Sequence, residues 1–185
     1  MAIRKIARLG HPVLRKKTRE VTREEISSPE MRRLVKDMVE TMHEYGGVGL
    51  AAPQVHEPVR LAIIEFDADD GRYDTGEVQP LLVIWNARVK VLDETPAGFW
   101  EGCLSVPGLR GYVERPSKIE VSYLDERGKP QTLQADGFLA TVFQHELDHL
   151  DGVLYVDKVV DKTKFAFSEE YARYHVEEGD ELVSE

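Results

Sequence analysis

The sequence predicts an α+β fold in which antiparallel or mixed β-sheets pack around one buried central helix. Two observations carry this prediction. Short runs with strand-like composition, separated by turn-rich segments, fill the middle of the chain. A mostly apolar helical stretch then covers residues 136–151, and a helix that is apolar on most sides lies inside a protein.

The individual elements follow from periodicity and from residues that begin or end them. In residues 28–45 the apolar positions recur at helical spacing, after a capping serine and a first-turn proline and before Gly46-Gly47. In the second helix Asp136 is the expected cap and Gly152 the expected end. The expected strands are Val59–Phe66, Leu81–Leu92, Gly111–Val113, Ile119–Leu124 and Gln131–Leu133.

Composition limits the classes of protein to consider. A chain of 185 residues with 42% hydrophobic and 31% charged residues fits one globular domain. No apolar run approaches about 18 residues and no secretory signal opens the chain, so we expect no membrane association. The net charge of −10 argues against a general nucleic-acid binder and against DNA as a partner. Residues 1–19 are basic, which fits either an ordinary solvated face or a contact with RNA. The single Cys103 excludes an internal disulfide and fits the reducing cytoplasm.

The most informative motif is His145-Glu146-Leu147-Asp148-His149, an H-E-x-x-H sequence. Residues four apart share one face of a helix, so the two imidazoles can bind a single metal ion. The glutamate between them suits a proton shuttle in metal-assisted hydrolysis. The alternative is a polar surface helix that spells the motif by chance. The apolar first half of this helix favours the metal, because a buried histidine pair needs partners.

A catalytic site of this kind needs a third protein ligand. Glu169 and Glu170 lie twenty or more residues past His149, as in a thermolysin-like endopeptidase. A third histidine at short spacing is missing, since His175 is the next one. Cys103 remains, in a segment whose Gly102 and Pro107-Gly108 indicate a bent, non-repetitive backbone.

Residues 46–54 form a third candidate segment. Its glycines let a ligand approach the backbone, and an extended peptide can add to such an edge. Gln54 ends the segment, and a side-chain amide near a metal is the kind of group that stabilises an oxyanion.

Three segments together resemble the motifs of the peptide deformylase family: Gly47-Val48-Gly49-Leu50-Ala51-Ala52-Pro53-Gln54, Glu101-Gly102-Cys103-Leu104-Ser105 and Gln144-His145-Glu146-Leu147-Asp148-His149. They occur in the family's order and at about its spacing, over roughly residues 3–162. The resemblance implies a hydrolase that removes the formyl group from the N-terminal methionine of newly made polypeptides and releases formate. It also implies transient proximity to the ribosome.

Matching positions imply the roles of individual residues. Cys103, His145 and His149 would bind one divalent metal ion, which in this family is commonly Fe(II), with Zn, Ni or Co able to occupy the site. Glu146 would act as general base and acid. The oxyanion of the reaction would be held by the side chain of Gln54 and the backbone N–H of Leu104.

The substrate side is predicted from the same resemblance. We expect an apolar methionine pocket walled by Val48 and by the metal helix, with Arg110 near its mouth, and peptide pairing along the backbone at residues 48–49 and 108–109. The residues assigned to substrate binding are Val48, Gly49, Gly108, Arg110, Phe138, Thr141 and Val142. Glu101 is expected to orient a ligand histidine.

Some features depart from the family pattern. Thr141 stands where many relatives carry a larger apolar residue, Ala87 stands where a proline often follows Asn86, and the polar loop at 67–80 is long. We therefore divide the chain into a catalytic domain at 1–162 and an extension at 163–185. The extension has a short helix near Lys164–His175 followed by an acidic tail, which does not match a basic ribosome-docking helix.

Three other functions each fit part of the sequence. An endopeptidase with a carboxylate as third ligand would keep its metal without Cys103. A copper electron-transfer site needs a weak axial methionine near its other ligands. The nearest methionine before Cys103 is Met42 and none follows, which argues against such a site. A structural zinc site needs four ligands, and Asp148 points away from the two histidines.

Overall fold

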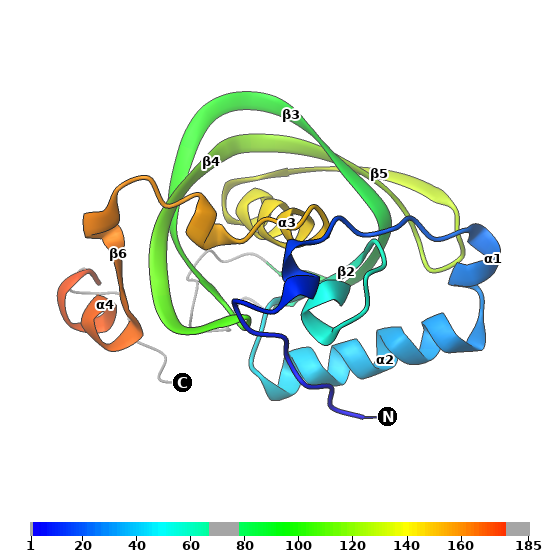
Figure 1. The fold of residues 1–185 in the computed structure, drawn as a ribbon. Coiled ribbons are helices and arrows are strands. Elements are labelled where there is room, and N and C mark those ends of the chain that lie inside the picture. Colours follow the sequence, from blue (N-terminus) through cyan, green and yellow to red (C-terminus); the bar gives the residue numbers. More distant parts are fainter. Residues whose placement is uncertain (1, 67–77, 177–185) are drawn as a thin grey trace.

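Six strands form one sheet that curves around helix α3 in the computed structural model, which describes residues 2–66 and 78–176 (Figure 1). Its strands are β1 (Gly49–Ala51), β2 (Leu61–Phe66), β3 (Gln79–Cys103), β4 (Val106–Leu124), β5 (Pro130–Asp136) and β6 (Phe165–Phe167). The helices are α1 (Arg23–Ile26), α2 (Pro29–Glu44), α3 (Gly137–Leu150) and α4 (Ser168–Tyr174), with short 3₁₀ turns at Pro12–Arg15, Ala52–Val55, Tyr155–Asp157 and Lys162–Lys164. This arrangement confirms the predicted fold class.

The order of strands is β1-β2-β3-β4-β5, and β6 pairs with β4. Every pair of named strands is antiparallel. Because β1 stands at the end of this order and pairs with β2, its other backbone edge faces away from the sheet. A free edge of this kind is where an extended peptide can add as a further strand.

The hairpin of β3 and β4 is longer than the sequence predicted. Three separate strands were expected in this region, but the two strands pair from Trp85–Leu124 as far as Cys103–Val106. Register shifts interrupt the pairing, and such bulges let a strand bend instead of ending. Cys103 is therefore the last residue of a strand and not part of a non-repetitive segment. The expected bend is present, because the register shifts between Glu101 and Cys103 and a turn follows at 104–105.

Helix α2 confirms the helix predicted at 28–45. The side chain of Ser28 accepts a hydrogen bond from the Met31 N–H, and Pro29 occupies the first turn. Its apolar face packs against β1, β2 and the start of β3 in one hydrophobic cluster. The buried members that α2 contributes to this cluster are Met31, Leu34, Met38 and Met42.

Helix α3 lies inside the curve of the sheet (Figure 1), and ten of its residues are buried. It starts after Asp136 as predicted, but the Asp136 side chain makes no capping hydrogen bond. The backbone of Gly152 has φ +77° just past the end of the helix, a conformation that favours glycine. Its apolar residues pack under β2, β3, β4 and β5, so the sheet shields them from water.

The C-terminal part differs from the single helix expected near Lys164–His175. Strand β6 pairs with Leu109–Gly111 of β4, and only residues from Ser168 onward form helix α4. The rings of Tyr171 and His175 each lie 4.8 Å from the ring of Trp100. The extension is thus packed on the outer face of the β3–β4 hairpin.

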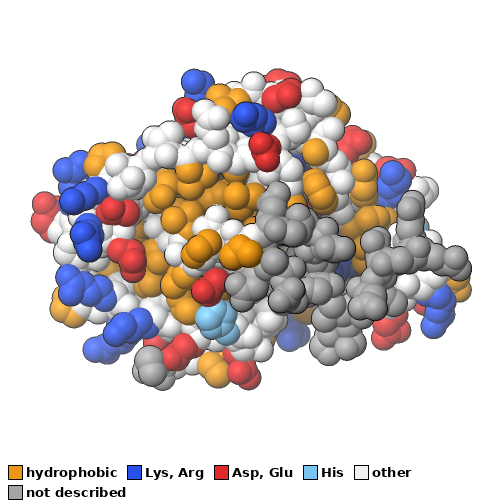
Figure 2. Space-filling view, turned by 180° about the vertical axis from the view of Figure 1, so that it is seen from behind, with side chains coloured by type: hydrophobic (Ala, Val, Ile, Leu, Met, Phe, Trp, Pro, Cys, Tyr) orange, Lys and Arg blue, Asp and Glu red, His pale blue; other side chains and the backbone are white. Residues whose placement is uncertain are grey.

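On the surface seen from behind, apolar side chains form a broad patch whose border carries charged residues (Figure 2). Helices long and apolar enough to cross a membrane are absent from the described ranges. Most of the predicted loop at 67–80 and the acidic tail at 177–185 lie outside the described residues.

Candidate active site

The two histidines of the motif point from α3 toward the end of β3. His145 and His149 are one helical turn apart, and 9% and 1% of their surfaces are exposed. The Cys103 Sγ lies 3.3 Å from the His149 Nε2. One candidate ligand atom from each of these three residues lies within 4.8 Å of the other two. The structure thus brings together three residues that are far apart in sequence.

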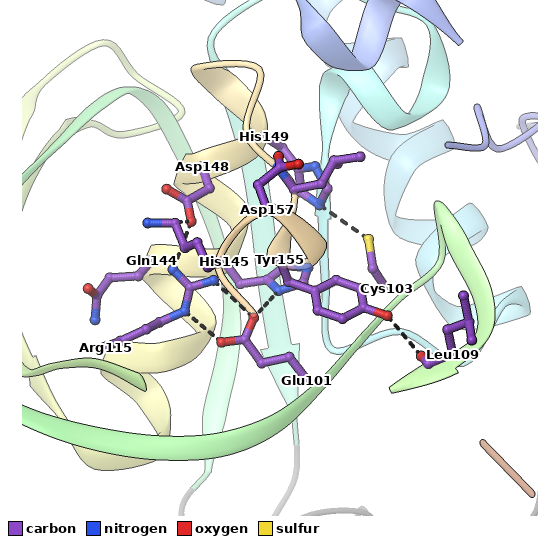
Figure 3. A network of polar contacts seen from close by, with 12 residues as sticks. Glu101, Cys103, Leu109, Arg115, Gln144, His145, Asp148, His149, Tyr155 and Asp157 are labelled. Carbon is purple, nitrogen blue, oxygen red and sulfur yellow. Dashed lines mark hydrogen bonds and ion pairs between the residues drawn. The ribbon is translucent and has the colours of Figure 1, made fainter. Parts of the chain in front are cut away.

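The free atoms of these side chains fit a metal ion. The His145 Nδ1 lies 2.7 Å from the Glu101 Oε2, which leaves Nε2 for a metal (Figure 3). Two imidazoles and a thiolate are ligands that suit Zn and Fe alike. The expected orientation of a ligand histidine by Glu101 therefore matches the geometry.

Glu101 is held in place by a buried arginine. Arg115 donates from Nε to one oxygen of Glu101 at 2.6 Å and from a terminal nitrogen to the other at 2.9 Å. Burial raises the pKa of Glu101, but its hydrogen bonds with Arg115 and His145 outweigh burial and lower the pKa to about 2. Glu101 is therefore charged at neutral pH and can accept a hydrogen bond from the His145 ring.

The two histidines have opposite electrostatic environments. Burial lowers the pKa of His145, but contacts with Cys103 and Glu101 outweigh it and raise that pKa well above its usual value. Burial lowers the pKa of His149, and the charge of His145 lowers it further. A neutral His149 is in the protonation state that a metal ligand needs.

Glu146 lies beside the ligands, against the backbone of β1. A Cβ at Gly49 would come within 2.5 Å of the Glu146 Oε1, so only glycine leaves room for this carboxyl group. Burial raises the pKa of Glu146 to about 7. Within the described residues its Oε2 is buried without a hydrogen-bond partner. These properties suit a group that takes up and releases a proton near neutral pH.

The amide of Gln54 faces the same space from the 3₁₀ turn after β1. Its Oε1 accepts a hydrogen bond from the Ala51 N–H at 2.8 Å, which directs Nε2 the other way. Nε2 lies 3.5 Å from the Cys103 Sγ and 3.3 Å from the Ser105 Oγ. Gln54 is 2% exposed, so its amide donor is fixed next to the candidate ligands.

The other expected site residues lie next to β1, at the turn after β3 and on α3. Leu104 follows Cys103 at the turn between β3 and β4, and Val48 packs against the apolar cluster of α3. Phe138, Thr141 and Val142 are buried on α3, with the Phe138 ring 5.7 Å from Phe66 and 5.8 Å from Phe99.

One part of the expected peptide path is closed. The backbone at Leu109–Gly111 pairs with β6 on one side and, at Gly111, with Glu101 of β3 on the other. The strand addition expected at 108–109 therefore fails at Leu109, because β6 already occupies that edge. Gly108 itself has φ +74° and open space around it, and Arg110 lies over Gly102 and 6.0 Å from the Tyr171 ring.

Sequence reasoning missed two residues near the ligands, Arg115 and Tyr155, and gave Asp148 no role. Arg115 holds Glu101, and it also donates to the Asp148 Oδ2 at 2.7 Å. The ring of Tyr155 is stacked at 6.0 Å from the His145 ring, and its hydroxyl donates to the Leu109 carbonyl oxygen (Figure 3). Asp148 was visible as a polar residue on a buried helix, but Arg115 and Tyr155 are distant in sequence and carried no local signal.

Comparison with known proteins shows the family of this chain. Residues 3–165 match the family model described as polypeptide deformylase. The chain belongs to this family. A peptide deformylase of Leptospira biflexa is 43% identical over 170 residues, which cover 92% of this chain and 95% of that protein.

Solved peptide deformylase structures have the same fold. A class I type b peptide deformylase from Acinetobacter baumannii, bound to Met-Ala-Ser, has a TM-score of 0.82 and 34% identity over 85% of this chain and 99% of its own. A peptide deformylase from Synechococcus elongatus in complex with actinonin has a TM-score of 0.76 and 37% identity, over 96% of this chain and 90% of its own. This deformylase is accordingly a metal-dependent hydrolase that removes the N-formyl group from newly made polypeptides.

Proposed function

We propose that Cys103, His145 and His149 bind one divalent metal ion in this deformylase. The convergence of their ligand atoms within 4.8 Å carries the proposal. Fe(II) is the proposed native ion, following the family, and Zn, Ni or Co are able to replace it. Because Zn usually binds such ligands more tightly than Fe, the native metal has to be measured in protein purified without oxygen.

Glu146 is proposed as the general base and acid. A metal ion at this site would supply Lewis acidity and a water molecule that ionises near neutral pH. The Glu146 carboxylate would take a proton from that water. It would pass the proton to the amide nitrogen, which leaves as the peptide's amine when its bond to the formyl carbon breaks. Its burial and its pKa of about 7 support both halves of this proton transfer.

The oxyanion that forms during the reaction would be held by Gln54 Nε2 and by the backbone N–H of Leu104. The Ala51 N–H fixes the Gln54 amide in the required direction. Leu104 adjoins Cys103, so a donor at Leu104 would lie on the same side of the centre. Donors that are fixed before the reaction stabilise developing charge without further reorganisation.

The substrate is proposed to add to the free edge of β1. Gly49 belongs to this edge strand and touches Glu146, so a peptide paired there would present its first residue to the centre. The methionine side chain would lie against Val48 and against the α3 residues Phe138, Thr141 and Val142. Arg110 and Gly108 would contact the peptide farther along, although Leu109 is already paired with β6.

The wider setting follows from the substrate. We propose that the catalytic domain spans 1–162 and that 163–185 is an extension. Because its substrates are newly made polypeptides, the enzyme would work in the cytoplasm and in transient proximity to the ribosome. The Met-Ala-Ser ligand of the Acinetobacter baumannii structure supports a short N-terminal peptide as the recognised unit.

The decisive experiment is an anaerobic purification followed by metal analysis and a formate-release assay. Formyl-Met-Ala-Ser is the substrate, and acetyl-Met-Ala-Ser is the control. We expect about one metal ion per chain and formate release from the formyl peptide alone. Cys103→Ala is expected to lose both metal and activity. A variant that keeps its metal would favour a carboxylate as third ligand, and full metal content without formate release would reject the proposed function.

The role of Glu101 is tested separately. Glu101→Gln keeps the shape of the side chain but weakens its hydrogen bond to the His145 Nδ1. Residues that orient metal ligands typically change metal affinity or activity by about 10- to 100-fold when mutated. Unchanged metal affinity and activity in this variant would contradict the role.

A further inference from the structure

A chain of buried charges leads away from the candidate metal centre. His145 contacts Glu101, and Glu101 accepts hydrogen bonds from Nε and one terminal nitrogen of Arg115. The other terminal nitrogen of Arg115 donates to the Asp148 Oδ2 at 2.7 Å (Figure 3). The side chains of Glu101 and Arg115 are 5% and 2% exposed. Asp148 is the second variable residue of the H-E-x-x-H motif, and its side chain turns away from both histidines.

Asp148 fixes the orientation of the arginine. A guanidinium is planar and carries its donors in a rigid fork, so two carboxylates at different positions define the plane and its rotation. Glu101 occupies Nε and one terminal nitrogen, and Asp148 occupies the other. Without Asp148, one anchor of the fork is lost, and the position of Glu101 opposite His145 is less well defined.

The outer end of this chain is accessible to water. Asp148 is 20% exposed and is also 3.3 Å from the Lys158 Nζ. It lies in the wall of a polar cavity of about 520 Å³ that Arg115 and Gln144 also line. A substitution can therefore remove the charge of Asp148, because water can take the place of the lost contact. Removal of Arg115 would instead leave the buried Glu101 without its cation.

We propose that Asp148 is a positioning residue for the metal centre. It acts through Arg115 and Glu101 on the His145 ring, so that one motif supplies two ligands, the general base and the outer support of one ligand. The inference rests on the proposed binding of a metal ion by Cys103, His145 and His149.

Asp151 offers a matched control. It lies one residue beyond α3, lines the same cavity and forms a two-pronged ion pair with Arg60 at 3.0 and 3.2 Å. Like Arg115, Arg60 is a mostly buried arginine, with 8% of its surface exposed. Among the described residues, its other side-chain hydrogen bonds go to the backbone oxygens of Ala87 and Leu150, and none of them reaches Glu101.

The experiment compares Asp148→Asn, Asp151→Asn and Glu101→Gln in protein loaded with Co(II). The measurements are the rate of Co(II) loss to excess EDTA and the visible and near-ultraviolet absorption of the bound ion. Urea unfolding of the metal-free proteins reports stability. We expect Asp148→Asn to release Co(II) about three to ten times faster than wild type, somewhat less than the effect usual for residues in direct contact with a ligand. Asp151→Asn is expected to match wild type in release rate.

The double variant Glu101→Gln/Asp148→Asn separates positioning from general stability. If Asp148 acts through Glu101, its substitution adds little once Glu101 is changed, whereas independent effects add. Asp148→Glu keeps a carboxylate and is expected to restore part of the slow release. The Co(II) spectrum of Asp148→Asn is expected to change in the direction seen in Glu101→Gln.

Several results would overturn the inference. These are a wild-type release rate in Asp148→Asn, equal acceleration in Asp148→Asn and Asp151→Asn, and full additivity in the double variant. In each case the proposed metal site would still stand. Wild-type protein that binds no Co(II) would instead reject the metal site, and the role of Asp148 with it.

Discussion

Helices α2 and α3 each bury polar side chains, but the two sets of side chains are in different situations. On α2, Asp37 accepts hydrogen bonds from the Ala2 N–H and the Arg4 side chain, and Thr41 accepts one from the Arg4 N–H. These contacts attach the N-terminal segment to the helix. These buried polar groups of α2 thus hold the N-terminal segment in place, and no catalytic role is needed to account for them.

The buried polar groups of α3 are incompletely satisfied. Within the described residues, the Glu146 Oε2 and the His149 Nδ1 lack hydrogen-bond partners. Native proteins rarely leave buried polar atoms unpaired, because each one costs about 1–3 kcal/mol. Burial of a polar residue is thus a weak sign of function, whereas burial beside other candidate ligands without a full set of partners is a strong one.

The largest expected effect comes from Glu146→Gln. The amide has nearly the same shape but cannot take up the proton of water, so we expect kcat to fall by about 10²- to 10⁴-fold. Metal content and the urea midpoint should stay close to wild type. Formate release and metal analysis on the same sample test this prediction. A variant with near-normal kcat would show that the unpaired carboxyl group of α3 is not the proton carrier.

Gly49→Ala tests the contact between β1 and α3. The new methyl group would lie 2.5 Å from the Glu146 Oε1, so the carboxyl group or the strand has to move. A displacement near a reacting group lowers kcat/KM, here by about 10- to 100-fold. Steady-state kinetics on formyl-Met-Ala-Ser provide the measurement. Wild-type kinetics would mean that the position of Glu146 tolerates a shift.

Asp37→Asn is the counterpart on α2. It weakens the charge-assisted hydrogen bond from Arg4 in a mostly buried setting, and we expect the free energy of unfolding to fall by about 1–3 kcal/mol. The kcat/KM per folded molecule should not change, because Asp37 only secures the N-terminal segment. Urea unfolding and kinetics at low temperature distinguish the two quantities. A large loss of kcat/KM would show that Asp37 on α2 also contributes to activity.

Ser28→Ala is expected to have the smallest effect. The Ser28 side chain accepts a hydrogen bond from the Met31 N–H at the start of α2, and loss of such a cap costs about 1 kcal/mol. Formate release should be unaffected. The urea midpoint measures the loss, with Ser28→Asp as a variant that can still accept the hydrogen bond. Equal urea midpoints for the alanine and aspartate variants would show that the Ser28 cap does not stabilise α2.

Local pattern was sufficient wherever a structure depends on neighbours in sequence. The periodicity of Met31 to Met42 and the Ser28 cap predict α2 nearly to its ends, and the apolar run before His145 predicts a buried α3. Sequence patterns did not predict the structure where two long strands pair with each other. The β3–β4 hairpin continues through positions that looked like turns, because its partner strand and its bulges decide where it ends.

The C-terminal part shows the same limit. Residues 165–167 have helical neighbours, yet they form β6 because the edge of β4 at Leu109–Gly111 offers unpaired backbone groups. The same pairing closes one stretch of the expected peptide path. The folded sheet therefore decides which strand edges stay unpaired. The composition of β4 or β6 alone does not show it.

The sequence alone was enough to predict the kind of chemistry, from two histidines and a glutamate on one helix, one cysteine, and three motifs that resemble peptide deformylase. Side-chain spacing within a helix is set by local geometry, so this much can be read directly. The tertiary structure decided which distant groups complete the site. Cys103 meets His149 across 46 positions, and Arg115 joins Glu101 to Asp148, because long-range strand pairing and packing bring them together.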